Sequence, residues 1–161
     1  MSLFSFFKRK PQRLRPRLSG EAVQALLLVA LRPKAVQPGV FQPNIEKRIL
    51  ACPTREEFEA VAQNAFRKWE ANRWECEDQL RRAIDAAQQK AAQEGISWAC
   101  GGLRADPPPS APAAVRMSER HKYAWVFLDT PKGRELAIFD TTANDWARLQ
   151  DLTGVEYCNT N

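Results

Sequence analysis

The segment at residues 105–114, ADPPPSAPAA, limits the possible folds of this chain more than any other feature, because it contains four prolines. Proline lacks the backbone N–H that a helix or an interior strand donates, so no regular element is expected to cross this segment. Its composition is typical of an extended linker, with recognition by an SH3-like groove as the alternative. The sequence therefore predicts two structured regions, residues 19–104 and 118–161, joined by a proline-rich linker at residues 105–117.

Basic residues are concentrated at the start of the chain. The whole sequence has 24 Lys+Arg, 19 Asp+Glu and a formal net charge of +5, but residues 1–17 contain six of the cations and no acidic residue. Residues 18–161 therefore carry 18 cations and 19 acidic residues, a net charge of −1. Binding to nucleic acid would depend on the first residues alone, since the rest lacks an excess of positive charge.

Residues 1–18 are expected to form a flexible arm that binds an anionic membrane surface. Phenylalanines precede the cations, so the rings would enter the lipid headgroup region while the cations contact acidic lipids. Stacking on the bases of DNA or RNA is the alternative, and a solvated tail is the third interpretation. The residues assigned to this membrane or nucleic-acid contact are Phe4, Phe6, Phe7, Lys8, Arg9, Lys10, Arg13, Arg15 and Arg17.

Helical signals dominate residues 19–104. Apolar residues recur at helical spacing within 21–32, and Pro33 ends that pattern. Further along, Thr54 and Glu57 have the spacing of a capping box, in which each side chain accepts a hydrogen bond from the backbone of the other residue. We therefore expect a mostly helical region whose second main helix begins after Thr54.

This second helix is expected to be long. An apolar stripe with three- and four-residue steps continues from Phe58 to Ala91, and Gly95 follows as a stop signal. An unbroken helix over residues 55–94 would measure about 60 Å, more than the diameter of a domain of this size. Either the helix is interrupted near Asn72 and Arg73, or it extends beyond the fold and forms a homo-oligomer.

The region after the linker predicts a small module made of a β-hairpin and a helix. Residues 123–128 and 135–139 are strand-like runs separated by turn residues. Apolar side chains on both faces of the first run imply that both faces are covered. Thr142 and Asp145 have the spacing of another capping box, which predicts a helix through Leu152. Together with the helical region, this gives an α+β fold class.

Cysteine, histidine and aspartate supply one candidate catalytic arrangement. The hairpin would place His121, just before its first strand, beside Asp140, just after its second. A thiol nucleophile would come from Cys52, just before the helix that starts near Thr54, or from Cys100. The order Cys, His, Asp and the setting of Cys52 resemble those of papain-like cysteine hydrolases, which implies His121 as the base. In the alternative interpretation His121 is a solvated strand-end residue and Asp140 a turn residue.

Other signatures of catalysis or of cofactor binding are absent. The four cysteines contain no CxxC pair and there is one histidine, so no metal site and no cofactor are expected. Gly-rich phosphate-binding motifs, GxSxG and HExxH do not occur. Cys76 and Cys158 fall in apolar patterns, where cysteine acts as a small hydrophobic residue.

The expected function is that of a non-enzymatic cytoplasmic adaptor or regulatory protein, attached peripherally to a membrane by its arm. A small DNA- or RNA-binding regulator and a cysteine hydrolase are the alternatives. The longest strongly apolar run, residues 25–31, is far shorter than the roughly 20 residues that span a membrane, and no secretory signal is expected. A protein partner would bind exposed tryptophans, which are enriched at binding hot spots. The candidates are Trp69, Trp74 and Trp98.

Overall fold

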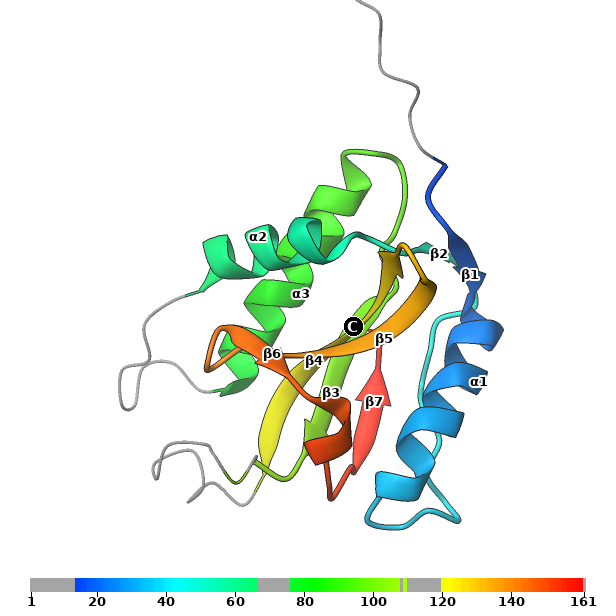
Figure 1. Cartoon of the computed structure of the whole chain (residues 1–161), viewed down its shortest axis with the longest axis vertical. Coiled ribbons are helices and arrows are strands. Elements are labelled where there is room, and N and C mark those ends of the chain that lie inside the picture. Colours follow the sequence, from blue (N-terminus) through cyan, green and yellow to red (C-terminus); the bar gives the residue numbers. More distant parts are fainter. Residues whose placement is uncertain (1–13, 67–75, 108, 110–119, 161) are drawn as a thin grey trace, which may run out of the picture.

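A computed structural model of the chain describes residues 14–66, 76–107, 109 and 120–160 (Figure 1). Its centre is a five-stranded antiparallel sheet with the strand order β6-β5-β4-β3-β7, and a separate two-stranded ladder pairs β1 with β2. The strands are β1 (Arg17–Ser19), β2 (Ile49–Ala51), β3 (Cys100–Ala105), β4 (His121–Thr130), β5 (Gly133–Asp140), β6 (Asp145–Ala147) and β7 (Tyr157–Asn159).

Helices lie on both sides of the sheet. In Figure 1, α2 and α3 lie on one side of it and α1 on the other, and the two buried apolar clusters follow the same division. The helices of the described residues are α1 (Gly20–Leu31), α2 (Arg55–Ala65) and α3 (Cys76–Ala92), with 3₁₀ turns η1 (Arg32–Lys34) and η2 (Leu149–Asp151).

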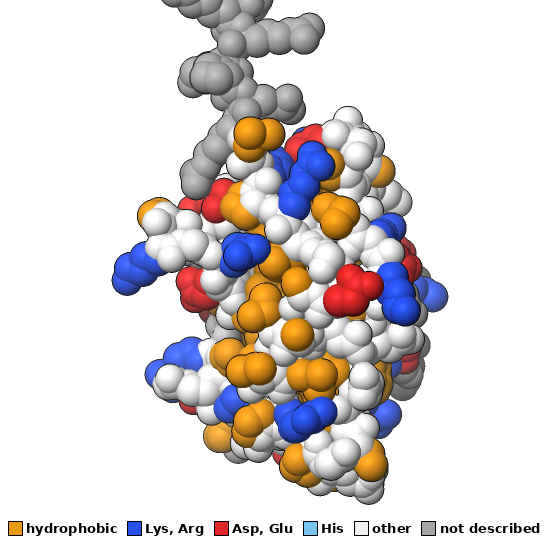
Figure 2. Space-filling view, turned by 90° about the vertical axis from the view of Figure 1, so that its right-hand side faces the viewer, with side chains coloured by type: hydrophobic (Ala, Val, Ile, Leu, Met, Phe, Trp, Pro, Cys, Tyr) orange, Lys and Arg blue, Asp and Glu red, His pale blue; other side chains and the backbone are white. Residues whose placement is uncertain are grey.

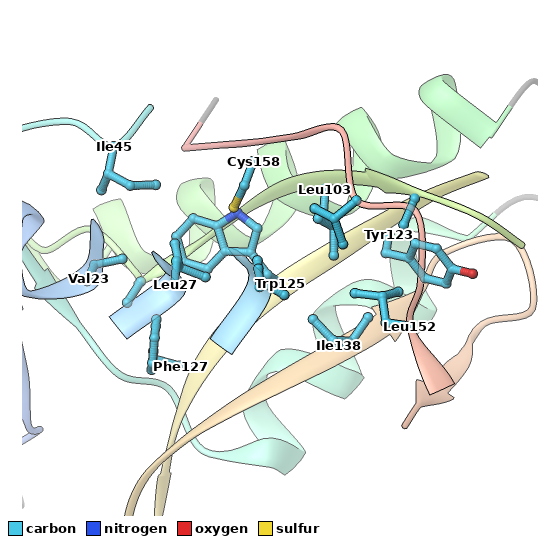
Figure 3. Packing of buried hydrophobic residues seen from close by; sticks show 14 of the residues in the cluster. Val23, Leu27, Ile45, Leu103, Tyr123, Trp125, Phe127, Ile138, Leu152 and Cys158 are labelled. Atoms are coloured by element: carbon cyan, nitrogen blue, oxygen red, sulfur yellow. The ribbon is translucent and has the colours of Figure 1, made fainter. Parts of the chain in front are cut away.

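The central strand β4 explains why there are two helical layers. Successive side chains of a strand point to opposite faces, and both sets are apolar here. One set packs in the core that includes α1, as Figure 3 shows for Trp125 and Leu27, and the other packs against α2 and α3. The first set is Tyr123, Trp125 and Phe127, and the second is Ala124, Val126 and Leu128.

Several local predictions are confirmed. β4 and β5 pair as the expected antiparallel hairpin. The first helix begins after Ser19, whose Oγ accepts a hydrogen bond from Ala22 N at 3.2 Å. At the start of α2, Glu57 N donates to Thr54 Oγ1 at 3.2 Å and Thr54 N donates to Glu57 Oε2 at 2.8 Å, so the capping box forms.

The expected α+β architecture is wrong. Residues 19–104 are not a mostly helical half, because they include β2 and β3, and β3 lies between β4 and β7 in the central sheet. The fold is β-rich: its described part is built on the five-stranded antiparallel sheet and the additional ladder, with three short helices. The same sheet therefore contains strands from before and after the proline-rich segment.

The single long helix over residues 55–94 is also wrong. α2 ends at Ala65 and α3 begins at Cys76, and the expected interruption near Asn72 and Arg73 lies outside the described residues. The apolar faces of α2 and α3 are buried in one cluster with the sheet. Since these faces pack within the fold, a homo-oligomer through a long helix loses its basis.

The helix expected after Thr142 does not form. The backbone N–H groups of Thr142 and Ala143 donate instead to Asp140 Oδ1, at 2.9 and 3.0 Å. Asn144 adopts a left-handed φ of 56°, and the chain returns along β5 as β6. Asp140 therefore organises a tight turn at the point where the capping pattern predicted a helix.

Candidate active site

His121 and Asp140 form a buried pair at one end of the sheet. His121 Nε2 lies 2.9 Å from Asp140 Oδ1, and the two side chains are 1% and 9% exposed. β4 starts at His121 and β5 ends at Asp140, so the hairpin brings these two candidate residues together.

The pair has a fixed orientation. Asp140 Oδ1 also accepts the two backbone hydrogen bonds of the following turn. The ring of His121 stands edge-on to the ring of Tyr123, with the centroids 4.6 Å apart. Because Nε2 faces the carboxylate, Nδ1 is the ring nitrogen left for a reacting group.

Cys52 lies far from this pair. The carbonyl of its neighbour Pro53 accepts a hydrogen bond from Asp129 N, near the opposite end of β4. Asp129 is eight residues along the strand from His121, which corresponds to about 26 Å. Burial raises the pKa of the Cys52 thiol to about 11, so it is protonated at neutral pH.

Cys100 and Cys158 are also misplaced for catalysis. Cys100 pairs with Val126, about 16 Å along β4 from His121, and faces the other side of the sheet. Burial raises its pKa to about 12. Cys158 is buried beside Trp125 (Figure 3), and burial raises its pKa as well. The structure therefore brings neither Cys100 nor Cys158 to the His–Asp pair.

Cys76, which the sequence placed in an apolar stripe, has a different setting. It is the first residue of α3, and it is partly exposed whereas the other three cysteines are buried. The next residue, Glu77, forms an ion pair with Lys122, Oε2 to Nζ at 2.6 Å, and Lys122 follows His121 in β4. The start of α3 therefore lies at the same end of the sheet as the His–Asp pair.

At this end of the sheet β4 is longer than its partner β5. Side chains alternate along the strand, so His121 faces the α1 side and Lys122 the α3 side. β5 ends at Asp140, which the continued register places opposite Tyr123, so β4 extends two residues beyond its partner. In the described part of the chain no strand pairs with His121 along this edge.

Two hydroxyl groups beside Asp140 lack hydrogen-bond partners. Thr141 Oγ1 and Thr142 Oγ1 are buried and unpaired within the described ranges. Buried polar groups in proteins are nearly always paired, often with water or a ligand. Within the described ranges these two hydroxyls are exceptions to that rule.

A groove of about 380 Å³ lies beside the first turns of α3. Helix α3 forms one side of the groove, and residues of β4 and β7 form the other. Its lining is mainly polar or charged and consists of Glu77, Asp78, Leu80, Arg81, Asp85, Lys122, Tyr157 and Asn159.

Comparison with known proteins gives a fold and no family. No family model matches the chain, and no curated protein matches it in sequence. The structure titled "PSL1a-E64 complex" matches with a TM-score of 0.66 and 16% identity over 88% of this chain and 49% of that chain. A Polyporus squamosus lectin bound to the epitope Neu5Aca2-6Galb1-4GlcNAc matches with a TM-score of 0.64 and 16% identity over 88% and 48%. The chain shares its fold with part of each of these two chains. It spans about half the length of both similar chains, and the likeness concerns the fold alone.

The residues assigned to a membrane or nucleic-acid contact are divided by the structure. Arg15 donates hydrogen bonds to the carboxylates of Glu57 and Glu94, with 3.1 Å between its Nε and Glu94 Oε2. Its guanidinium group is therefore ion-paired within the fold. Arg17 is exposed in β1, next to the buried Leu18. Arg15, Arg17 and Leu18, which were expected in the flexible arm of residues 1–18, therefore belong to the described fold. Outside the described residues lie Phe4, Phe6, Phe7, Lys8, Arg9, Lys10 and Arg13.

Of the three tryptophans assigned to partner binding, the structure describes Trp98. Trp98 is completely buried and packs in the core beneath α3. Trp69 and Trp74 lie outside the described residues. The described tryptophans therefore give no support to a tryptophan-lined partner surface.

Two further features concern only the residues that the structure places. No helix among them is long and apolar enough to cross a membrane. None of their His, Cys, Asp and Glu side chains gather in a group of three or more that could hold a metal ion.

Proposed function

We propose that this protein is a cysteine-dependent enzyme that hydrolyses or transfers acyl groups. Cys76 is the nucleophile, His121 the general base, and Asp140 the residue that orients His121. The observation that carries the proposal is the buried His121–Asp140 pair at the end of the sheet where α3 begins with a cysteine. The three other thiols are buried, and burial raises the pKa of each, which leaves Cys76 as the candidate nucleophile.

The proposed reaction proceeds in two steps. The Cys76 sulfur attacks the carbonyl carbon of an ester, thioester or amide, while His121 Nδ1 takes the thiol proton and passes it to the leaving group. The leaving alcohol, thiol or amine departs, and the acyl group remains on sulfur as a thioester. Water or an acceptor amine then attacks the thioester, with His121 as base, and the Cys76 thiol is restored.

The first turn of α3 favours both steps. The N–H groups of a helix N-terminus have no intrahelical acceptor, and their positive field stabilises a thiolate and a developing oxyanion. Glu77 and Asp78 oppose that field. Their carboxylates are paired, however, with Lys122 at 2.6 Å and Arg81 at 3.2 Å. These ion pairs leave more of the helix field acting on the sulfur.

An activated ester provides the test. With p-nitrophenyl acetate we expect a stoichiometric burst of p-nitrophenol and one acetyl group on Cys76, located by peptide mass spectrometry. Cys76→Ser and His121→Gln should each slow the burst at least about 100-fold, the usual contribution of such groups. Cys52→Ala, a matched removal of a distant thiol, should keep it. A burst that persists in Cys76→Ser, or acetylation at another residue, would show that the proposal is wrong.

Carbohydrate binding is a second candidate function. Its support is the groove beside α3, where Asp85, Tyr157 and Asn159 offer groups that exchange hydrogen bonds with sugar hydroxyls, together with the lectin that shares the fold. Calorimetric titration with Neu5Aca2-6Galb1-4GlcNAc tests it. Binding that is lost in Asp85→Ala and kept in Lys90→Ala would support this function. Absence of binding, or binding unchanged by Asp85→Ala, would refute it.

A further inference from the structure

Helix α1 has apolar side chains on its outer side as well as its inner one. Val23, Leu27 and Leu31 are buried against the sheet. On the outer side, Val29 is 79% exposed and Leu26 is 43% exposed. Figure 2 shows apolar side chains gathered on the side of the molecule where α1 lies in Figure 1. Since surface helices are normally polar on the side away from the core, the outer apolar residues of α1 form a candidate docking surface.

Charges of opposite sign flank this surface. At 100° per residue, Glu21, Ala25, Val29 and Arg32 point outward along one stripe, and all four are exposed. Glu21 lies in the first turn of α1 and Arg32 directly after its last residue, about 16 Å apart along the axis. Neither side chain has an ion-pair partner within the ranges that the structure describes.

We infer that α1 is the contact helix of a two-fold symmetric dimer of this chain. When two α1 helices pack antiparallel, Glu21 of each copy faces Arg32 of the other, so the ion pair forms twice. The small Ala25 allows a close approach of the helices, and Leu26 and Val29 fill the centre of the contact. A second copy supplies the matching charge spacing by symmetry, whereas an unrelated protein would need the same spacing by chance. This inference does not depend on the proposed catalytic activity.

Charge reversal tests this arrangement. Sedimentation equilibrium of the full chain should show a monomer–dimer equilibrium. Glu21→Arg places like charges opposite each other at both ends, and Arg32→Glu does the same, so each should raise the dimer Kd at least about tenfold. The double variant restores opposite charges and should return the Kd to within about threefold of wild type. Lys90→Glu, an exposed reversal on α3, is the control and should leave the Kd unchanged.

Three results would overturn the inference. The first is a wild-type chain that stays monomeric at about 100 µM, well above the Kd of a specific dimer. The second is a dimer that both single reversals leave intact, and the third is a double variant as weak as the singles. Circular dichroism checks that each variant folds. If a reversal fails to fold, Val29→Asp replaces it, and a dimer that survives this substitution also overturns the inference.

Discussion

The buried His121–Asp140 pair is held together by the hydrogen-bonding needs of its two side chains. A buried imidazole N–H left without an acceptor costs about 1–3 kcal/mol, so a histidine that is 1% exposed requires its partner. Asp140 supplies the acceptor, and the two backbone N–H groups of the next turn hold its carboxylate in place. The orientation of the His121 ring is therefore set by folding alone.

Removing the carboxylate should measure the contribution of this pair to stability. Asp140→Ala leaves the His121 N–H buried and unpaired and also removes the acceptor for Thr142 N, so we expect the free energy of unfolding to fall by about 2–3 kcal/mol in urea. Asp140→Asn keeps one acceptor oxygen and should cost less than half as much. Equal unfolding curves for wild type and Asp140→Ala would contradict this account.

The buried thiols give a second prediction at the scale of the residue. Burial raises the pKa of Cys52 to about 11 and that of Cys100 to about 12, against an ordinary value of 9.0. At pH 8 both should therefore resist dithiobis(nitrobenzoate) in the folded protein and react at the ordinary rate in guanidinium. The folded state binds these thiol protons more tightly than the unfolded state does. This difference stabilises the fold in full below pH 9, and the stabilisation is lost as the pH rises towards 11. Rapid labelling of either thiol in the folded protein would contradict this.

At the scale of the element, the sequence predicts the structures that depend on neighbouring residues. The hairpin, α1 and the capping box of α2 each follow from a short local pattern. β3 does not, because Gly101 and Gly102 have low strand propensity and its pairing with β4 and β7 depends on distant residues. The apolar pattern does not predict the start of α3, because its period continues through that position. The acidic Glu77 and Asp78, typical of a first helical turn, are the sequence signal that marks it.

Gly101 shows why β3 tolerates little change. A Cβ at this position would overlap the Asn159 carbonyl of β7 and come within 2.8 Å of Trp125 Cζ2. Gly101→Ala should therefore lower the free energy of unfolding by about 3 kcal/mol, as overpacking of a core does. Gly39→Ala has no atom within 4 Å of the new Cβ and is the matched control. Equal thermal unfolding temperatures for the two variants would refute this packing.

An ion pair at the N-terminus of α2 makes the stability of the fold depend on pH. The hydrogen bond from Arg15 holds the pKa of Glu57 below its ordinary value of 4.5, and the bonds from Thr54 act in the same direction. A depressed folded-state pKa stabilises the fold above pH 4.5, and this stabilisation is lost as the pH falls below that value. Glu57→Gln should therefore be less stable than wild type at pH 7, with the difference shrinking towards pH 3. A difference independent of pH would exclude this ion pair as its source.

For the whole molecule, one sheet carries two apolar cores and places the candidate catalytic residues at its end. The juxtaposition of His121 and Asp140 could be predicted from the sequence because a single hairpin creates it. The nucleophile could not, since choosing among the cysteines requires knowing which helix begins at that end of the sheet. The position of α3 is fixed by its packing on the sheet and by the Glu77–Lys122 ion pair, and both contacts join residues that are distant in the sequence.

The rate of alkylation of each cysteine tests the proposed nucleophile most directly. Iodoacetamide at pH 7, with peptide mass spectrometry as the readout, should modify Cys76 at least about tenfold faster than Cys52, Cys100 or Cys158. His121→Ala should slow the alkylation of Cys76 itself at least about tenfold, and Lys90→Ala should leave the rate of Cys76 unchanged. If Cys76 reacts no faster than the buried thiols, or at the same rate with and without His121, the sulfur and the imidazole do not act together and the proposed enzyme does not exist.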